Sequence, residues 1–176
     1  DVILTGFGLQ DSHLFPHQFE RTPGGWFYLA QGLFNSSKVI RPGGKPFADG
    51  KKEIPFIQTK LARFRPDGSE FEPVSAGPNN IWGLSQTRDG RVFIQEANDI
   101  GIPVAEFEPG THYTSGRKDK LQPYAPQIPA SLKGRQMGGT GLSGLALVED
   151  KNSPFRLGHS GDVFVLVNPI TSRLQI

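Results

Sequence analysis

Three segments of the chain repeat one pattern, in which strand-like stretches flank a tight turn rich in glycine. Glycine supplies the positive φ that short hairpin turns require, and aromatic or β-branched residues follow these turns at once. The pattern therefore predicts a series of antiparallel hairpins. The segments are 19–30 with Pro23-Gly24-Gly25, 82–94 with Arg88-Asp89-Gly90, and 145–167, whose longer loop ends at Ser160-Gly161.

Two further hairpins are predicted on the same grounds. Residues 61–71 alternate side chains around Pro66-Asp67-Gly68, and residues 163–167 are expected to pair with 172–176. The chain has 22 glycines and 15 prolines in 176 residues, well above the ~12% that these two types usually contribute together. Long helices are therefore not expected as the main architecture.

The recurrence favours an all-β fold, and a β-propeller over a sandwich or an open sheet. The turns lie roughly 65–70 residues apart, whereas a propeller blade takes roughly 40–50 residues, so each interval would hold one blade plus an insertion. The insertions are expected as long loops near 41–57 and 100–139, where Gly, Pro and polar residues show weak periodicity. We expect residues 1–176 to form a single partial propeller domain of roughly three blades. Such a set cannot close a ring, and the chain opens at Asp1 without Met, so it is expected to be a fragment.

The charge balance and composition exclude several classes of protein. There are 19 Lys and Arg against 17 Asp and Glu, a net charge of +2, and the longest basic cluster, 117–120, contains an acid. Nucleic-acid binding is not expected from so dispersed a charge. The absence of cysteine excludes disulfides, thiolate nucleophiles and Cys-ligated metals. No apolar run approaches the ~18 residues of a membrane-spanning helix.

His13 and His17 precede the first predicted hairpin and are candidates for a general base, because imidazole is the usual base near neutral pH. Two histidines four residues apart could also ligate a metal from one helix, but Pro16 between them disfavours a helix. The structural alternative is that one histidine bonds loop backbone groups while the other is exposed.

Asn79 and Asn80, followed by Trp82, stand at the entry to a predicted strand, where side chains can point into a central cavity. Amide side chains there could orient a ligand rich in carbonyl groups. The alternative is an ordinary turn, since Pro78-Asn79-Asn80 is good turn chemistry without any ligand.

Glu96, Asn98 and Asp99 follow the next predicted strand and could serve a hard cation such as Ca²⁺. Their spacing is not that of an EF-hand loop, and an Asn-Asp turn is the alternative. The glycine-rich stretch 138–144 lacks the Lys-Ser/Thr of a P-loop and the strand-then-helix context of a dinucleotide site.

Taken in chain order, these motifs resemble the soluble quinoprotein glucose/sorbosone dehydrogenase propellers, and more closely the propeller domains of bacterial membrane-bound dehydrogenases. In that family a His-containing loop precedes a glycine turn, an Asn-containing segment enters a later blade, and a Ser-Gly-Leu-Ala segment opens another. The matching segments here are Asp11-Ser12-His13 with Pro23-Gly24-Gly25-Trp26, Gly77-Pro78-Asn79-Asn80-Ile81-Trp82-Gly83-Leu84, and Leu142-Ser143-Gly144-Leu145-Ala146.

The resemblance implies a six-bladed propeller that oxidises a sugar, or a related alcohol or aldehyde, by hydride transfer to pyrroloquinoline quinone (PQQ) beside Ca²⁺. It also implies a periplasmic or secreted location and an electron-acceptor protein as a possible partner. The implied roles are His13 as the base, Asn79, Asn80 and Trp82 beside the cofactor, and Glu96, Asn98 and Asp99 as the calcium loop.

One departure favours a different function. Asn79 stands where the family has an Arg that contacts the cofactor, which removes a cation that would stabilise reduced quinone. Together with the long insertions, this favours the alternative of a non-catalytic propeller module that binds protein or glycan. A third possibility, a calcium-dependent lactonase-like hydrolase, needs more carboxylates than Glu96 and Asp99 supply.

Overall fold

The structure is a computed structural model of antiparallel sheets joined by turns, as the sequence predicts for an all-β protein. Its helical elements are 3₁₀ turns of three residues. The described residues divide into two compact units, one up to residue 76 and the other from Ile81 onward. The residues described are 1–32, 34–57, 59–76, 81–96, 104–107, 143–156, 158, 163–169 and 172–176.

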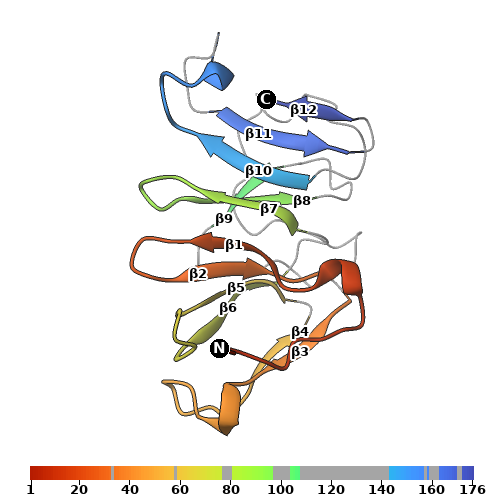
Figure 1. Cartoon of the computed structure of the whole chain (residues 1–176), viewed down its shortest axis with the longest axis vertical. Coiled ribbons are helices and arrows are strands. Elements are labelled where there is room, and N and C mark those ends of the chain that lie inside the picture. The colour runs from red at the N-terminus through yellow and green to blue at the C-terminus, as the bar shows by residue number, and fades with distance from the viewer. Residues whose placement is uncertain are drawn as a thin grey trace. The chain divides into compact units, whose positions relative to one another are not determined.

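The first unit contains a four-stranded antiparallel sheet with a separate hairpin inserted into it. The sheet has the order β1-β2-β5-β6, so that each strand pairs with the next except where β3 and β4 intervene and pair with each other (Figure 1). The strands are β1 (His17–Arg21), β2 (Phe27–Ala30), β3 (Ser36–Val39), β4 (Ile54–Ile57), β5 (Thr59–Phe64) and β6 (Phe71–Ala76).

The glycine turns close the hairpins as the sequence predicts. Gly25 donates its backbone N–H to the Thr22 carbonyl at 3.3 Å, and Gly90 does the same to Thr87 at 3.0 Å. Their φ angles are +77° and +90°, in the region that favours glycine. Gly68 plays the corresponding part between β5 and β6, with φ +68°. The predicted hairpins 19–30, 61–71 and 82–94 are therefore confirmed.

One end of the four-stranded sheet is held by a tryptophan between two arginines. The guanidinium carbon of Arg65 lies 4.0 Å from the centre of the Trp26 ring and that of Arg63 lies 4.4 Å from it. Arg65 also donates from its guanidinium to the Gly24 carbonyl at 2.7 Å. Cation–π contact and this hydrogen bond thus tie the turn after β1 to the turn after β5.

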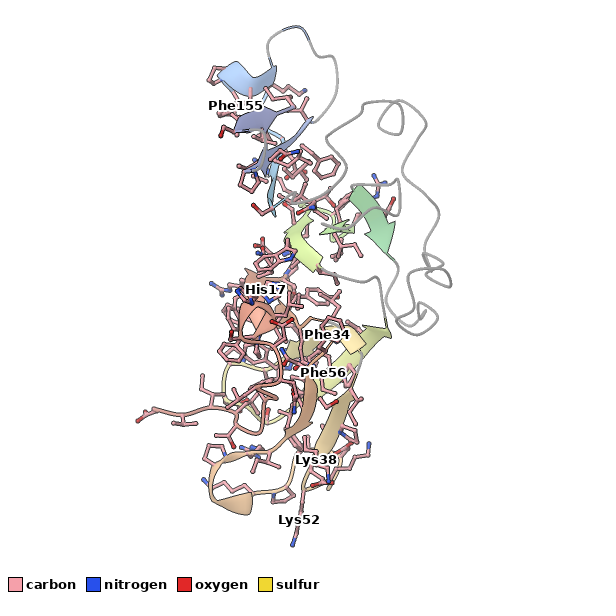
Figure 2. All side chains as sticks on the ribbon, turned by 90° about the vertical axis from the view of Figure 1, so that its right-hand side faces the viewer. His17, Phe34, Lys38, Lys52, Phe56 and Phe155 are labelled. Carbon is pink, nitrogen blue, oxygen red and sulfur yellow. The ribbon has the colours of Figure 1, made fainter. Side chains whose placement is uncertain are left out.

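The core of the first unit lies between the β3–β4 hairpin and one face of the sheet. Phe56 of β4 is fully buried and meets Phe71 of β6 edge to face, with ring centroids 5.4 Å apart. Figure 2 shows Phe56 inside this unit and Lys52 extending away from it. The N-terminal segment runs along the hairpin, where Thr5 bridges Ile40. The buried core side chains are Leu29, Val39, Phe47, Ile54, Phe56, Ala62 and Phe71.

The prediction of a loop near 41–57 is partly wrong, because the last residues of this segment form β4. In this strand Ile54 and Phe56 are buried while Pro55 and Ile57 are exposed. That alternation is the period of a half-buried strand, but it spans only four residues and follows a Gly-rich turn, η2 (Pro42–Gly44). Within the other predicted loop, 100–139, Val104–Phe107 forms β9, and the rest lies outside the described residues.

The second unit contains two three-stranded antiparallel sheets, each in chain order, β7-β8-β9 and β10-β11-β12. Residues 145–148 pair with 163–167, as predicted. The predicted pairing of 163–167 with 172–176 also forms, between β11 and β12. The strands are β7 (Ile81–Gln86), β8 (Val92–Glu96), β9 (Val104–Phe107), β10 (Ser143–Val148), β11 (Val163–Asn168) and β12 (Arg173–Gln175).

The two sheets of the second unit contact each other through their first and second strands. The Leu147 backbone of β10 donates to the Ser85 hydroxyl of β7 at 3.2 Å. The rings of Phe93 and Phe164 lie 4.8 Å apart between centroids. At Gly83 of β7 the approach is closest, since a Cβ built there would lie 2.6 Å from the Cβ of Leu145. Glycine is the residue expected where another backbone comes this near.

No helix in the described part of the chain is long and apolar enough to cross a membrane. This agrees with the sequence, in which no apolar run of that length occurs.

We predict that Gly83→Ala lowers the stability of the second unit by about 1–3 kcal/mol, the usual cost of overpacking a tight contact. The added methyl would overlap Leu145 and also the Gln95 side chain, whose Cβ would lie 2.8 Å away. Urea unfolding followed by a probe in this unit measures the change. Ala146→Ser, at an exposed neighbouring position, should stay within about 0.5 kcal/mol of the original protein. An unchanged midpoint for Gly83→Ala would contradict the packing.

Candidate functional site

The candidate site is the short turn that carries His13. It begins at Asp11, whose extended backbone and side chain cap the 3₁₀ turn η1 (Ser12–Leu14). The Asp11 carboxylate accepts the His13 backbone N–H at 3.0 Å, as an N-cap aspartate does. Leu14 is buried and anchors the other end. Pro16 restricts Phe15 to an extended conformation, so the turn ends there.

The imidazole of His13 is exposed and faces the Asp11 carboxylate. The side chain is 87% exposed, and its Nδ1 lies 3.4 Å from Asp11 Oδ1. A carboxylate accepts but does not donate, so this arrangement favours a proton on Nδ1 and leaves Nε2 as the proton-accepting atom on the solvent side. The turn therefore presents an exposed imidazole beside a carboxylate.

A buried asparagine lies beneath the turn and binds both of its ends. Asn35 is fully buried. Its Oδ1 accepts the Asp11 backbone N–H at 2.9 Å, and its Nδ2 donates to the carbonyls of Asp11 at 3.1 Å and Leu14 at 2.6 Å. The Gly32 backbone N–H adds a further bond to the Leu14 carbonyl at 3.1 Å. The Asp11 N–H and the Leu14 carbonyl thus gain partners outside the turn, while the Asp11 carbonyl also accepts the Leu14 N–H within it at 3.2 Å.

Asn35 is itself held by a second buried amide. Gln31 donates from Nε2 to the Asn35 carbonyl at 3.0 Å and to the Phe56 carbonyl at 2.9 Å, and its Oε1 accepts a bond from the Ser37 hydroxyl. Ser37 in turn accepts the Gly8 backbone N–H at 2.9 Å. The result is a continuous buried polar network from the β3–β4 hairpin to the His13 turn, with its groups hydrogen-bonded as buried polar groups require.

The strand after the turn starts with an irregularity. The pairing of β1 with β2 shifts between His17 and Glu20, and Gln18 takes φ +57°, a left-handed conformation uncommon for a residue other than glycine. His17 donates from Nδ1 to the carbonyl of Phe15, as the structural alternative for one of the two histidines expects. Bulges of this kind often lie beside functional sites, where they redirect side chains.

Burial changes the titration of one carboxyl group close to the turn. Glu20 of β1 is partly buried, and desolvation raises its pKa above the usual value of 4.5. Its folded form therefore holds a proton more readily than the unfolded chain does.

The residues assigned to cofactor and metal divide between described and undescribed parts of the chain. His13 lies in the first unit, and Trp82 lies half-buried on β7 in the second. Glu96 ends β8, where only its backbone is described, and Asn79, Asn80, Asn98 and Asp99 lie outside the described residues. Among the residues that the structure does describe, no three His, Cys, Asp or Glu side chains gather to hold a metal ion.

Asn35 is the site residue that sequence reasoning missed. It lies 24 positions from Asp11, at the start of a hairpin that was itself predicted as a loop in part. Nothing in the local pattern indicates the contact, because it depends on how β3 and η1 pack. The contact between Asp11 and His13 is easier to expect from the sequence, since the two residues flank Ser12 in the Asp-x-His motif.

Fold and site together define an all-β protein with antiparallel sheets and an exposed histidine turn braced by a buried polar network. Comparison with protein families gives a more specific assignment. The chain belongs to a domain family of unknown function, DUF7133, whose model matches residues 1–138. The match includes the His13 turn and the whole of β7 and β8. No curated protein and no solved structure matches the chain.

We predict that Gly32→Ala displaces the His13 turn and destabilises the first unit by about 1–3 kcal/mol. A Cβ at Gly32 would lie 2.0 Å from the Cβ of Leu14, so that Leu14 could not keep its buried position. Denaturant unfolding measures the loss. Ser12→Ala, on the exposed side of the same turn, should change stability by less than about 0.5 kcal/mol. Equal stabilities of the two variants would show that the turn does not dock as described.

A second prediction follows from the raised pKa of Glu20. Between the unfolded and the folded pKa the folded protein binds more protons than the unfolded chain, so the Glu20 contribution to stability falls as pH rises through this window. Glu20→Gln should therefore gain stability relative to the original protein between pH 4 and pH 7. Below pH 4 the stability difference between them should no longer change with pH. Thermal unfolding across this range measures it, and a difference that stays constant throughout would contradict the prediction.

Proposed function

We propose that the chain is part of a β-propeller, as one partial domain with roughly three blades. Support comes from the sheets, because β1-β2-β5-β6 is a four-stranded antiparallel meander interrupted by one hairpin, and the other two sheets are meanders in chain order. In a propeller, blades converge toward the central channel, so the first strands of successive blades come closest together. The tight approach of β7 to β10 at Gly83 has this character.

We further propose that the full protein is an oxidoreductase of the PQQ-dependent sugar dehydrogenase type, acting on a sugar or a related alcohol or aldehyde. The observation that supports this most directly is the His13 turn, because an exposed imidazole oriented by Asp11 is suited to take a proton from a substrate hydroxyl. Asp11 would orient the imidazole through its contact with Nδ1. PQQ, when bound, would supply the hydride acceptor that the oxidation of a hydroxyl to a carbonyl requires.

Trp82, the one cofactor residue whose side chain the structure describes, suits this proposal. Trp82 presents a half-buried indole on β7, next to the close contact at Gly83, and a flat aromatic surface suits a planar ring system. Asn79 and Asn80 would orient the cofactor, and Glu96, Asn98 and Asp99 would hold Ca²⁺. A periplasmic or secreted location and an electron-acceptor protein complete the proposal.

A non-catalytic binding module remains the second candidate, and a specific observation favours it. Three large apolar side chains that are close in sequence to the His13 turn or to Asn35 are exposed. Leu9 is 74% exposed, Phe34 66% and Phe15 40%. Exposed apolar side chains can mark a surface that binds a partner where they form a continuous patch. Phe34 adjoins Asn35, which grips the turn. A protein or glycan could bind here without any proton transfer.

The decisive variant is His13→Ala in the full-length protein, supplied with PQQ and Ca²⁺ and assayed for oxidation with a panel of sugars. Loss of a general base should lower kcat about 10²–10⁴-fold, while quinone binding, followed by its absorbance, should persist. Ser12→Ala is the control, because its side chain is exposed in the same turn and has no proposed role. No oxidation by the unsubstituted protein under these conditions would sink the dehydrogenase proposal and leave the binding module, whereas full activity of His13→Ala would reject His13 as the base.

A further inference from the structure

We propose that Asn35 is the positioning residue for His13, setting the orientation of the imidazole without touching it. The inference deepens the proposed function, since it concerns the same base, but its geometric part can be tested whether or not the protein oxidises anything.

The hydrogen bonds of Asn35 use its amide fully and in one orientation. Both Nδ2 hydrogens are taken by carbonyls, of Asp11 and Leu14, and Oδ1 accepts the N–H of Asp11. Turning the amide over would place its oxygen against the carbonyl oxygens of Asp11 and Leu14, and its N–H groups against the Asp11 N–H. The environment therefore permits a single orientation, as it must for a fully buried amide.

These bonds act on the residue that orients the histidine. Asn35 grips the peptide groups on both sides of the Asp11 Cα, through the Asp11 N–H and carbonyl. With its backbone held, the Asp11 carboxylate reaches both the His13 N–H, at 3.0 Å, and His13 Nδ1, at 3.4 Å. Loss of the Asn35 bonds would let the Asp11 backbone rotate, and the carboxylate would leave Nδ1.

His13 itself has little else to restrain it. Its side chain is 87% exposed, so packing does not select a rotamer. A base without packing depends on hydrogen-bonded support to hold its proton-accepting atom in place, and a displacement of about 1 Å can cost a large factor in rate. In this unit the support reaches the imidazole through the side chains of Asn35 and Asp11.

The test compares two isosteric substitutions, Asn35→Asp and Gln31→Glu. Both residues are fully buried, and both substitutions replace an amide with a carboxyl group, but Asn35 alone of the two bonds the His13 turn. In protein labelled with ¹⁵N at histidine, the imidazole nitrogen shifts report which nitrogen of neutral His13 carries the proton, with the His13 signal assigned from His13→Gln.

We expect the Nδ1-protonated form of His13 to predominate in the original protein and in Gln31→Glu, and to lose its predominance in Asn35→Asp. The Asp11 amide should exchange with solvent about tenfold faster in Asn35→Asp, because the second carboxyl oxygen would face the carbonyls of Asp11 and Leu14, and their repulsion displaces the oxygen that accepts the Asp11 N–H. Under conditions where both variants are folded, amides in β2 and β5 should exchange at equal rates in the two. Where Asn35→Asp does not fold, Asn35→Ser gives the same comparison.

The outcomes separate this proposal from the proposed function. An unchanged tautomer and an unchanged Asp11 amide in Asn35→Asp would overturn the positioning role. Both changes, together with full oxidation by His13→Ala, would support the positioning role and reject His13 as the base. Both changes, together with a lowered kcat and a nearly constant KM in Asn35→Asp, would support the two proposals jointly.

Discussion

The buried amides of Gln31 and Asn35 are the constraint on which the first unit depends. They connect the His13 turn with both strands of the β3–β4 hairpin, at its start and at the Phe56 backbone. A buried polar group without a partner costs about 1–3 kcal/mol. The pieces must therefore assemble together, since each supplies the partners that another requires.

The same network explains how an exposed site can be well ordered. Apolar packing holds the sheet and the β3–β4 hairpin through Phe56 and Phe71, but it does not reach the imidazole of His13. Hydrogen bonds are directional, so they can hold a solvent-facing turn in one conformation where packing cannot. Leu14 is the exception that connects the two, because its side chain joins the buried interior while its carbonyl joins the polar network.

How much of this structure the sequence predicts depends on how far apart in the chain the interacting residues lie. The hairpins follow from local chemistry, since Gly25, Gly68 and Gly90 adopt the positive φ that their turns demand. β4 was missed because it has only four residues, so the alternation of its buried and exposed side chains is too short to be recognised in the sequence. Asn35 could not be recognised, because its partners lie 21 and 24 positions away and only the packed structure brings them together. His13 was proposed as a base from its chemistry, and Asp11 appeared only as part of the matching motif, whereas the exposure of the imidazole and its contact with Asp11 follow only from the folded structure.

Glycine turns are compatible with any function, so they say more about the fold than about the site. The informative positions are those where the chain departs from a simple meander: the left-handed Gln18 in a bulge, Gly83 where two strands nearly touch, and Asn35 buried beneath an exposed turn. A left-handed conformation at a residue other than glycine costs stability, and residues held at such a cost concentrate at functional sites. Gln18 and Asn35 both lie close to the turn that carries His13, one strained and the other fully hydrogen-bonded. Both features therefore support the proposal that the chemistry of this unit lies at His13.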